Sequence, residues 1–174
     1  MKRQILIETM NGDDSNIAVE TLTEGTTNNK KMWMKGIFMQ AETRNRNGRI
    51  YPLSEMVTAV TKFNEAIKEG NGVVGEITHP ENSLNIDYKY ASHVITEARI
   101  DGNNVICKAV ILENTPCGKI LKEIYDVGVR PKVSSRGTGS LDSDNKVSEF
   151  HIVTVDAVST PSAVAATPEL IYEG

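Results

Sequence analysis

The pattern of hydrophobic and polar positions predicts two helices. Apolar residues recur at spacings of four, three and four from Met56 to Ile67, which is the stripe of an amphipathic helix after Pro52. Ser54 is its expected N-cap and Gly70 its expected end. A second helix is predicted from Thr115 as N-cap and Pro116 at the first helical position, ending at Gly128. Its expected buried face consists of Ile120, Leu121, Ile124 and Tyr125.

Short β-branched or alternating stretches predict many strands. The turn Asp101-Gly102-Asn103 between two such stretches indicates a β-hairpin. The other expected strands cover residues 5–7, 33–40, 73–77, 131–135 and 147–158. Many short strands with two helices predict a mainly β, α+β fold, with an antiparallel sheet or barrel and the helices packed outside it.

The ends of the chain differ from its middle. Residues 11–31 are mostly Asn, Asp, Thr, Glu and Gly, a composition that buries little apolar surface and is typical of a mobile arm. We therefore expect an N-terminal strand and polar arm at 1–31, one globular domain at 32–162 and a tail at 163–174. The sequence does not say whether 1–31 is a propeptide.

Composition excludes several classes of protein. The 174 residues carry a net charge of −4, which does not favour a nucleic-acid-binding surface. No apolar run approaches the roughly 20 residues of a membrane span, and Glu8 interrupts the only candidate leader. Two cysteines form no disulfide framework, so a reducing compartment is expected. Three histidines without a Cys-x-x-Cys pair make a structural zinc site unexpected.

The segment 132–139 places two hydroxyls, a permanent cation and two glycines together. An attacking serine needs a base and donors for the oxyanion, and glycines let backbone N–H groups approach a reacting oxygen. Ser134 or Ser135 could be such a nucleophile, supported by Arg136 and Gly137. A solvated hairpin end rich in Ser and Gly would show the same composition.

Two further residues suggest acid–base chemistry. His79 follows an expected buried strand and precedes a proline, a strand end where functional groups often lie. Asp156 interrupts the apolar run 152–158, and a buried carboxylate needs a partner. That partner is either a histidine or a backbone group or arginine. His151 falls on the opposite face of the same strand, because strand side chains alternate.

Five segments, in this order, resemble the prohead core proteases of tailed bacteriophages. They span most of the globular part of the chain and consist of residues 45–52, 75–81, 114–121, 133–139 and 155–162.

The resemblance implies a serine protease fold like that of the herpesvirus assemblins, an antiparallel β-barrel surrounded by helices. It also implies His79 as general base, Ser134 as nucleophile and Asp156 as the third member of a catalytic triad. His151 and Glu76 remain rivals of Asp156, although the spacing of Glu76 and His79 sends their side chains to opposite faces of a strand. Oxyanion support would come from Arg136 and from backbone N–H groups, such as those of Ser135 or Gly137.

The same resemblance implies a role inside the phage prohead, in the host cytoplasm. The expected substrates are scaffolding core proteins and the major capsid protein, cleaved after Glu, with a homo-oligomer as the expected assembly and no metal or organic cofactor. Self-cleavage is expected at Glu24-Gly25 and Glu173-Gly174. The expected pocket for the substrate glutamate is the basic loop with Arg44, Arg46 and Arg49.

Two other functions stay open at this point. Cys117 lies near a helix N-terminus, which favours a thiolate, so a cysteine protease using Cys117 with His79 is conceivable. A catalytically inactive scaffold or capsid-interior protein with the same fold would be marked by a missing nucleophile or base. Neither residue is missing here.

Overall fold

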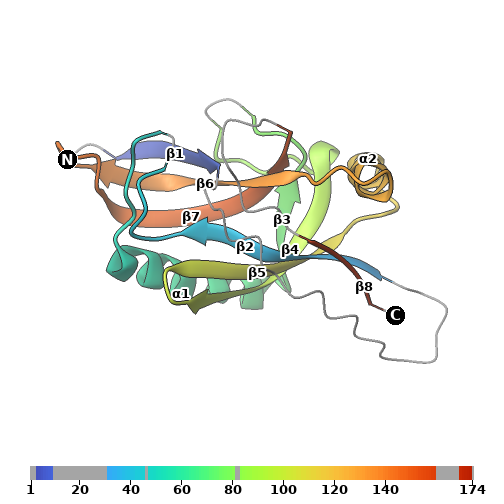
Figure 1. The fold of residues 1–174 in the computed structure, drawn as a ribbon, viewed down its shortest axis with the longest axis horizontal. Helices are drawn as coiled ribbons and strands as arrows, with labels where there is room; N and C mark the ends of the chain where they lie inside the picture. The colour runs from blue at the N-terminus through green and yellow to red at the C-terminus, as the bar shows by residue number, and fades with distance from the viewer. Residues whose placement is uncertain (1–2, 10–30, 46, 81–82, 160–168, 174) are drawn as a thin grey trace.

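The computed structural model describes residues 3–9, 31–45, 47–80, 83–159 and 169–173. Two α-helices and a 3₁₀ turn accompany the strands of two antiparallel sheets (Figure 1). In chain order the elements are β1 (Gln4–Thr9), β2 (Lys31–Gln40), α1 (Leu53–Gly70), β3 (Val73–Glu76), η1 (Tyr88–Tyr90), β4 (Ala91–Asp101), β5 (Asn104–Ile111), α2 (Pro116–Asp126), β6 (Lys132–Leu141), β7 (Val147–Val158) and β8 (Glu169–Glu173).

The described strands form two open sheets, so the expected single barrel is corrected. One sheet has the order β1-β6-β7 and the other β3-β4-β5-β2-β8. The edge strands β7 and β3 approach each other, but β3 has only four residues and just one bridge follows it, between Ile77 and Ala157. The two sheets therefore meet at this edge without a continuous ladder. The mainly β content and the antiparallel pairing are confirmed.

Helix α1 packs on β7 and β4 with the predicted stripe. Met56, Val60, Phe63 and Ile67 are all buried. The predicted end at Gly70 is confirmed, whereas the predicted N-cap Ser54 is wrong by two residues. Pro52 occupies the N-cap position, where the Leu53 N–H donates to the Glu42 carboxylate at 2.5 Å. The left-handed residue after the helix is Asn71, which like glycine tolerates that conformation.

Helix α2 begins as predicted. The Thr115 hydroxyl oxygen accepts a hydrogen bond from the Gly118 N–H at 3.0 Å. A Cβ on Gly118 would lie 1.7 Å from the Leu112 carbonyl oxygen, so this turn of the helix requires glycine. Leu121 and Tyr125 are buried, whereas Ile120 is 51% exposed and does not belong to the buried face. The first turn buries Cys117 and Gly118 instead.

The two ends of the described chain belong to the sheets. Strand β1 pairs with β6 along its whole length and buries Leu6 in the core. Strand β8 pairs with β2, Lys31 opposite Glu173. The predicted division at 31 and 162 therefore does not follow the strand pairing, because β1 and β8 complete the sheets of the globular domain. The expected arm itself lies outside the described residues, apart from Lys31.

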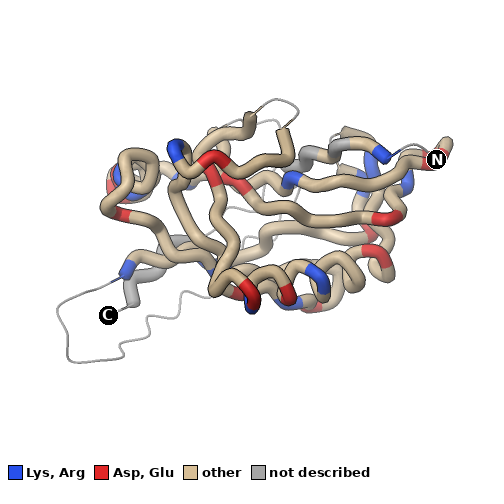
Figure 2. Tube along the Cα trace, turned by 180° about the vertical axis from the view of Figure 1, so that it is seen from behind, with Lys and Arg blue, Asp and Glu red and all other residues tan. Residues whose placement is uncertain are grey.

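Charge is distributed over the described part of the molecule. Figure 2 shows acidic and basic residues interspersed along the helices and strands, α1 and α2 included. No described helix is long and apolar enough to cross a membrane. Within the described ranges, no group of three or more His, Cys, Asp or Glu side chains is arranged to hold a metal ion.

Candidate active site

The backbone turns sharply at the end of β3 and so directs His79 toward β7. The Thr78 N–H donates to the Ala157 carbonyl at 2.7 Å, continuing the bridge between Ile77 and Ala157. Thr78 has φ +66°, a left-handed conformation that is strained for a β-branched residue. Such strain persists only where surrounding contacts impose it, and it is frequent at functional sites.

His79 and Asp156 are in direct contact. The distance between His79 Nδ1 and Asp156 Oδ2 is 2.7 Å, and the Asp156 side chain is fully buried while that of His79 is 18% exposed. An ionised carboxylate only accepts, so Nδ1 carries the proton in this bond and Nε2 is left as a base. Nε2 is buried and has no hydrogen-bond partner among the described residues. This is the arrangement that a general base requires.

Ser134 lies on the same face of the sheet as Asp156. In the β6–β7 pair Ser134 stands directly opposite Asp156, and Ser135 stands opposite Val155. Opposite residues of an antiparallel pair point to the same face, and neighbours along a strand point to opposite faces. The register therefore separates the two hydroxyls: Ser134 shares the face of Asp156 and Ser135 does not. Both side chains are buried.

Arg136 forms the centre of a buried cluster on this face. Its Nε donates to Asp156 Oδ2 at 3.0 Å, and one terminal nitrogen donates to Asp156 Oδ1 at 3.1 Å and to Glu76 Oε2 at 2.5 Å. The other terminal nitrogen donates to the carbonyls of Ser83 and Asn85, at 3.2 and 3.1 Å. These five bonds use all five guanidinium donors. The prediction that Arg136 holds an oxyanion is corrected, since no donor is left for one.

Neither rival of Asp156 bonds His79 among the described residues. The Glu76 carboxylate bonds Arg136, and the Glu76 backbone N–H donates to Asp156 Oδ1 at 3.0 Å. His151 is exposed and stands opposite Thr138, away from the cluster in the register. Of these three candidates, Asp156 is the one whose side chain contacts His79.

The close approach of β7 explains why position 137 is a glycine. A Cβ at this position would lie 2.2 Å from the His151 carbonyl oxygen, next to a β-bulge. Its glycine character is thus required by the approach of β7. Backbone N–H groups, such as those of Ser135 or Gly137, stay a prediction as oxyanion donors.

A second histidine, His93, joins the two sheets behind the site. Its Nε2 donates to the Val155 carbonyl and its Nδ1 accepts from the Ser92 hydroxyl, both at 2.8 Å. Burial lowers the pKa of His93, outweighing the Val155 hydrogen bond and the Asp156 charge, which raise it, so this imidazole is neutral. Gly75 makes room for the ring, because a Cβ there would lie 2.0 Å from His93 Nε2.

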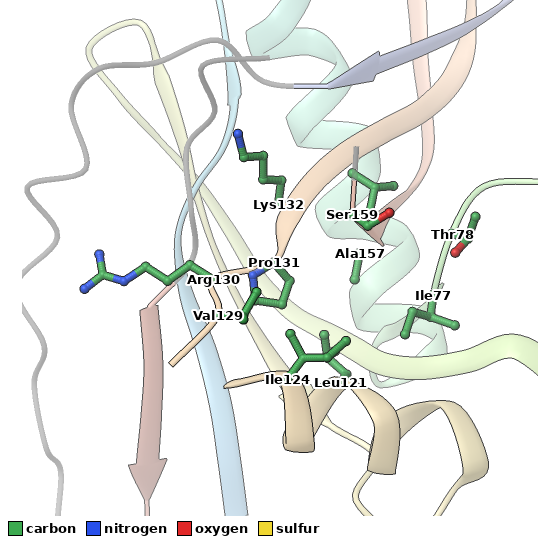
Figure 3. Close-up of a pocket in the computed structure, with 11 residues that line it drawn as sticks. Ile77, Thr78, Leu121, Ile124, Val129, Arg130, Pro131, Lys132, Ala157 and Ser159 are labelled. Carbon is green, nitrogen blue, oxygen red and sulfur yellow. The ribbon is translucent and has the colours of Figure 1, made fainter. Parts of the chain in front are cut away.

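A cavity of about 380 Å³ adjoins the cluster between α2 and the ends of β6 and β7. Figure 3 shows the aliphatic side chains of Leu121 and Ile124 facing Ile77, while the charged ends of Arg130 and Lys132 extend away from them. The cavity is thus apolar inside with two cations at its margin.

The segments that line this cavity lead directly into the candidate triad. Thr78 precedes His79, Ala157 follows Asp156, and Lys132 begins the strand that carries Ser134. The cavity therefore borders the three segments that carry the candidate triad.

Known proteins are similar to this chain in sequence and in fold. The family model described as prohead core protein serine protease matches residues 7–173. The prohead core protein protease of Enterobacteria phage T4 is 39% identical over 153 residues, which cover 82% of this chain and 71% of that protein. The chain belongs to the prohead core protein serine protease family. A solved structure, the capsid assembly protease gp21 of bacteriophage T4, has a TM-score of 0.79 at 31% identity, covering 92% of this chain and 100% of the other.

The basic loop expected to form a substrate pocket in this prohead protease lies far from Ser134. Arg44 donates to the carbonyls of Gly48 and Asp144, and Ile50 bridges to Lys146 in the turn between β6 and β7. Ser134 lies near the other end of β6, about 20 Å away at roughly 3.3 Å per residue. The structure does not bring Arg44 and Arg49 to the candidate triad, and Arg46 lies outside the described residues.

Cys117 is a buried residue in the first turn of α2. Its thiol contacts the Lys89 carbonyl oxygen at 3.8 Å. His79 instead bonds Asp156, which belongs to the buried cluster around Arg136. The geometry gives Cys117 no connection to the base that a cysteine protease would need.

Sequence reasoning missed the two cations of the cavity and the partner of Glu76. Arg130 and Lys132 line the cavity, and Glu76 bonds Arg136. A signal was present for each. Arg130 and Lys132 lie just before Ser134 in the sequence, and Glu76 and Arg136 are single charges among the uncharged residues 73–77 and 133–140.

Proposed function

We propose that this chain is a serine endopeptidase that matures the phage prohead. The observation that carries the proposal is the contact between His79 Nδ1 and Asp156 Oδ2, with Ser134 opposite Asp156 on the same face. Ser134 as nucleophile, His79 as base and Asp156 as orienting acid are the residue types of a catalytic triad. The chain belongs to a protease family.

The mechanism is acyl transfer through a covalent intermediate. The Ser134 hydroxyl attacks the substrate carbonyl while His79 Nε2 takes its proton, and the imidazolium then protonates the leaving amine. Asp156 holds the proton on Nδ1 and stabilises the imidazolium. Backbone N–H groups beside Ser134 stabilise the oxyanion. Water then releases the acyl group by the same steps in reverse.

The names of the relatives support the proposed substrates. Their names describe a prohead core protein protease and a capsid assembly protease. By that kinship this chain cleaves scaffolding core proteins and the major capsid protein inside the prohead, within the host cytoplasm, as a homo-oligomer. Kinship with the herpesvirus assemblins remains a prediction of the same kind.

Incubation of the purified protein with a Glu-containing scaffold peptide tests the function. Mass spectrometry should show cleavage after Glu, and a serine-directed covalent inhibitor should stop it with a label on Ser134. Cleavage that persists with Ser134 fully labelled would contradict the serine mechanism. A label on Cys117 from a thiol-directed reagent, with loss of activity, would favour the cysteine protease.

The cavity provides a specificity pocket for this reaction. We expect the aliphatic interior to accept an apolar substrate side chain and the cations at its margin to attract the substrate glutamate. Replacing Arg130 and Lys132 with Gln should lower kcat/KM for a Glu peptide on the order of tenfold, as expected for the loss of hydrogen bonds to a charged group. The matched Gln peptide should be cleaved at an unchanged rate.

The variant Arg44→Gln is the control, because it removes a cation at the opposite end of the β6–β7 hairpin. It should leave the preference for Glu intact. If Arg44→Gln abolishes that preference and the Arg130/Lys132 variant keeps it, the basic loop is the pocket after all.

The active protein should also cleave itself. Glu24-Gly25 belongs to the polar segment outside the described residues, and Glu173 is the last residue of β8, before Gly174. Both bonds follow a glutamate that lies two residues after an apolar residue. Residues 121–123 have the same pattern but lie inside α2, where a helical backbone resists the extended conformation that a protease needs. N-terminal sequencing and intact mass should show a new N-terminus at Gly25 and loss of Gly174.

The Ser134→Ala variant should stay full length under the same conditions. An enzyme that cuts scaffold peptides but leaves both bonds intact would rule out self-processing while leaving the protease function standing.

A further inference from the structure

Three charged side chains lie together in the interior behind His79. Glu76 is 1% exposed, and Arg136 and Asp156 are fully buried. Burying charge is costly, and a buried ion pair is often no more stable than an apolar replacement. The cluster therefore calls for an explanation beyond stability.

Arg136 ties together segments distant in the sequence. It contacts both oxygens of Asp156, and it binds the carbonyls of Ser83 and Asn85 in the chain that follows His79. The guanidinium thus fixes the carboxylate that orients the imidazole, and also the segment that leads away from it. Rigid support of this kind is what a reacting group needs to stay in productive geometry.

Arg136 alone would weaken the partner that it positions. An ion pair of Asp156 with Arg136 has no net charge, so it attracts a protonated imidazole poorly. Glu76 adds a second carboxylate, bonded to the same guanidinium. The cluster of two carboxylates and one guanidinium then has a net charge of −1. When His79 takes up a proton, the cluster and the imidazolium together have no net charge.

We infer that Glu76 and Arg136 are positioning residues for the triad, Arg136 by fixing Asp156 and the chain after His79, and Glu76 by offsetting the charge of Arg136. The inference rests on the proposed function, since it concerns the proton that His79 takes from Ser134. Glu76 thereby keeps Asp156 effective in stabilising the imidazolium that forms during attack.

The groups that face Asp156 come from each element packed around it. They are His79 after β3, Glu76 in β3, Arg136 in β6 and His93 in β4. His93 is neutral because its burial lowers the pKa of the imidazole, while its Nδ1 accepts from Ser92 and its Nε2 donates to Val155. Within the described residues, the charge balance is therefore set by Glu76, Arg136 and Asp156.

Glu76→Gln is the central test, because it keeps the shape of the side chain and removes one charge. The imidazolium loses part of its stabilisation, so the acid limb of the pH profile of kcat/KM should move to lower pH by about 1 unit. Plateau kcat should fall with KM unchanged, since the base is weaker and the substrate pocket is intact. Glu97→Gln, which removes an exposed carboxylate from β4, is the matched control and should change neither.

Arg136→Met should move the acid limb in the opposite direction, to higher pH, because two carboxylates then remain. The double variant Glu76→Gln/Arg136→Met restores the net charge of −1, so its acid limb should return close to that of the wild type, with a lower kcat from the lost positioning. A merely structural role would not give shifts of opposite sign that cancel.

The outcomes separate this inference from the proposed function. If the wild type cleaves no peptide, the function itself fails. If the wild type is active and folded Glu76→Gln keeps the wild-type acid limb, the inference fails alone. If Glu76→Gln does not fold, Glu76→Asp, which keeps the charge, should retain the wild-type limb, and a shift would overturn the inference.

Discussion

Replacing Ser134 with Ala is expected to reduce kcat for peptide cleavage by on the order of 10⁴- to 10⁶-fold, the range for a triad nucleophile. The residue stands opposite Asp156 in the β6–β7 register and so shares the face on which His79 is held. The substitution removes one buried oxygen and should leave the fold intact. Steady-state cleavage of a scaffold peptide, with circular dichroism of both proteins, measures the loss.

Ser135→Ala is the matched control for this prediction. Ser135 stands opposite Val155, on the other face of the same strand, so its variant should keep substantial activity. Cys117→Ser should also remain active. The choice of nucleophile is wrong if the Ser135 variant is dead and the Ser134 variant cleaves.

Elements with a local signal could be predicted from the sequence. The stripe from Met56 to Ile67 forms the buried side of α1, and Thr115 caps α2 through its hydroxyl. The turn Asp101-Gly102-Asn103 joins β4 and β5. In each case the residues that decide the structure lie within one short segment of the chain.

Pairing across long separations left no such signal. β1 finds its partner in β6, more than a hundred residues later, and β8 finds β2 across most of the chain. These long-range pairings decide whether the strands close into one barrel or form two open sheets. The exposure of Ile120 likewise depends on what packs against α2, which periodicity alone does not specify.

The candidate site divides in the same way. Asp156 could be predicted to need a partner, because a carboxylate inside an apolar strand is costly when unpaired. The same reasoning predicts that Glu76 and Arg136 also need partners of opposite charge. Sequence spacing does not tell whether Arg136 bonds Glu76, Asp156 or both. The register of β6 with β7, and the approach of β3, decide that Arg136 bonds both.

Asp156→Asn is expected to cost about 10⁴ in kcat, a loss of the size seen when a triad acid becomes an amide. The reason lies in the partners of Asp156, all of which are donors. Oδ1 accepts from the Glu76 N–H and from Arg136, while Oδ2 accepts from Arg136 Nε and His79 Nδ1.

An amide nitrogen must replace one of these oxygens. In place of Oδ1 it would oppose two fixed donors, from Glu76 and Arg136. In place of Oδ2 it opposes only Arg136 Nε, because His79 can change tautomer and accept. The second placement is therefore favoured, and it moves the imidazole proton to Nε2, where His79 can no longer act as base toward Ser134.

The control for this argument is His151→Ala, which alters an exposed residue on the other face of β7 and should cost little. His79→Ala should match Ser134→Ala, since triad members act as a unit. Peptide cleavage by the four variants, measured at one pH on the plateau, decides among the candidate acids. If His151→Ala is as damaging as His79→Ala while Asp156→Asn is mild, the imidazole is oriented by a second histidine, and the donor-only environment of Asp156 has no catalytic consequence.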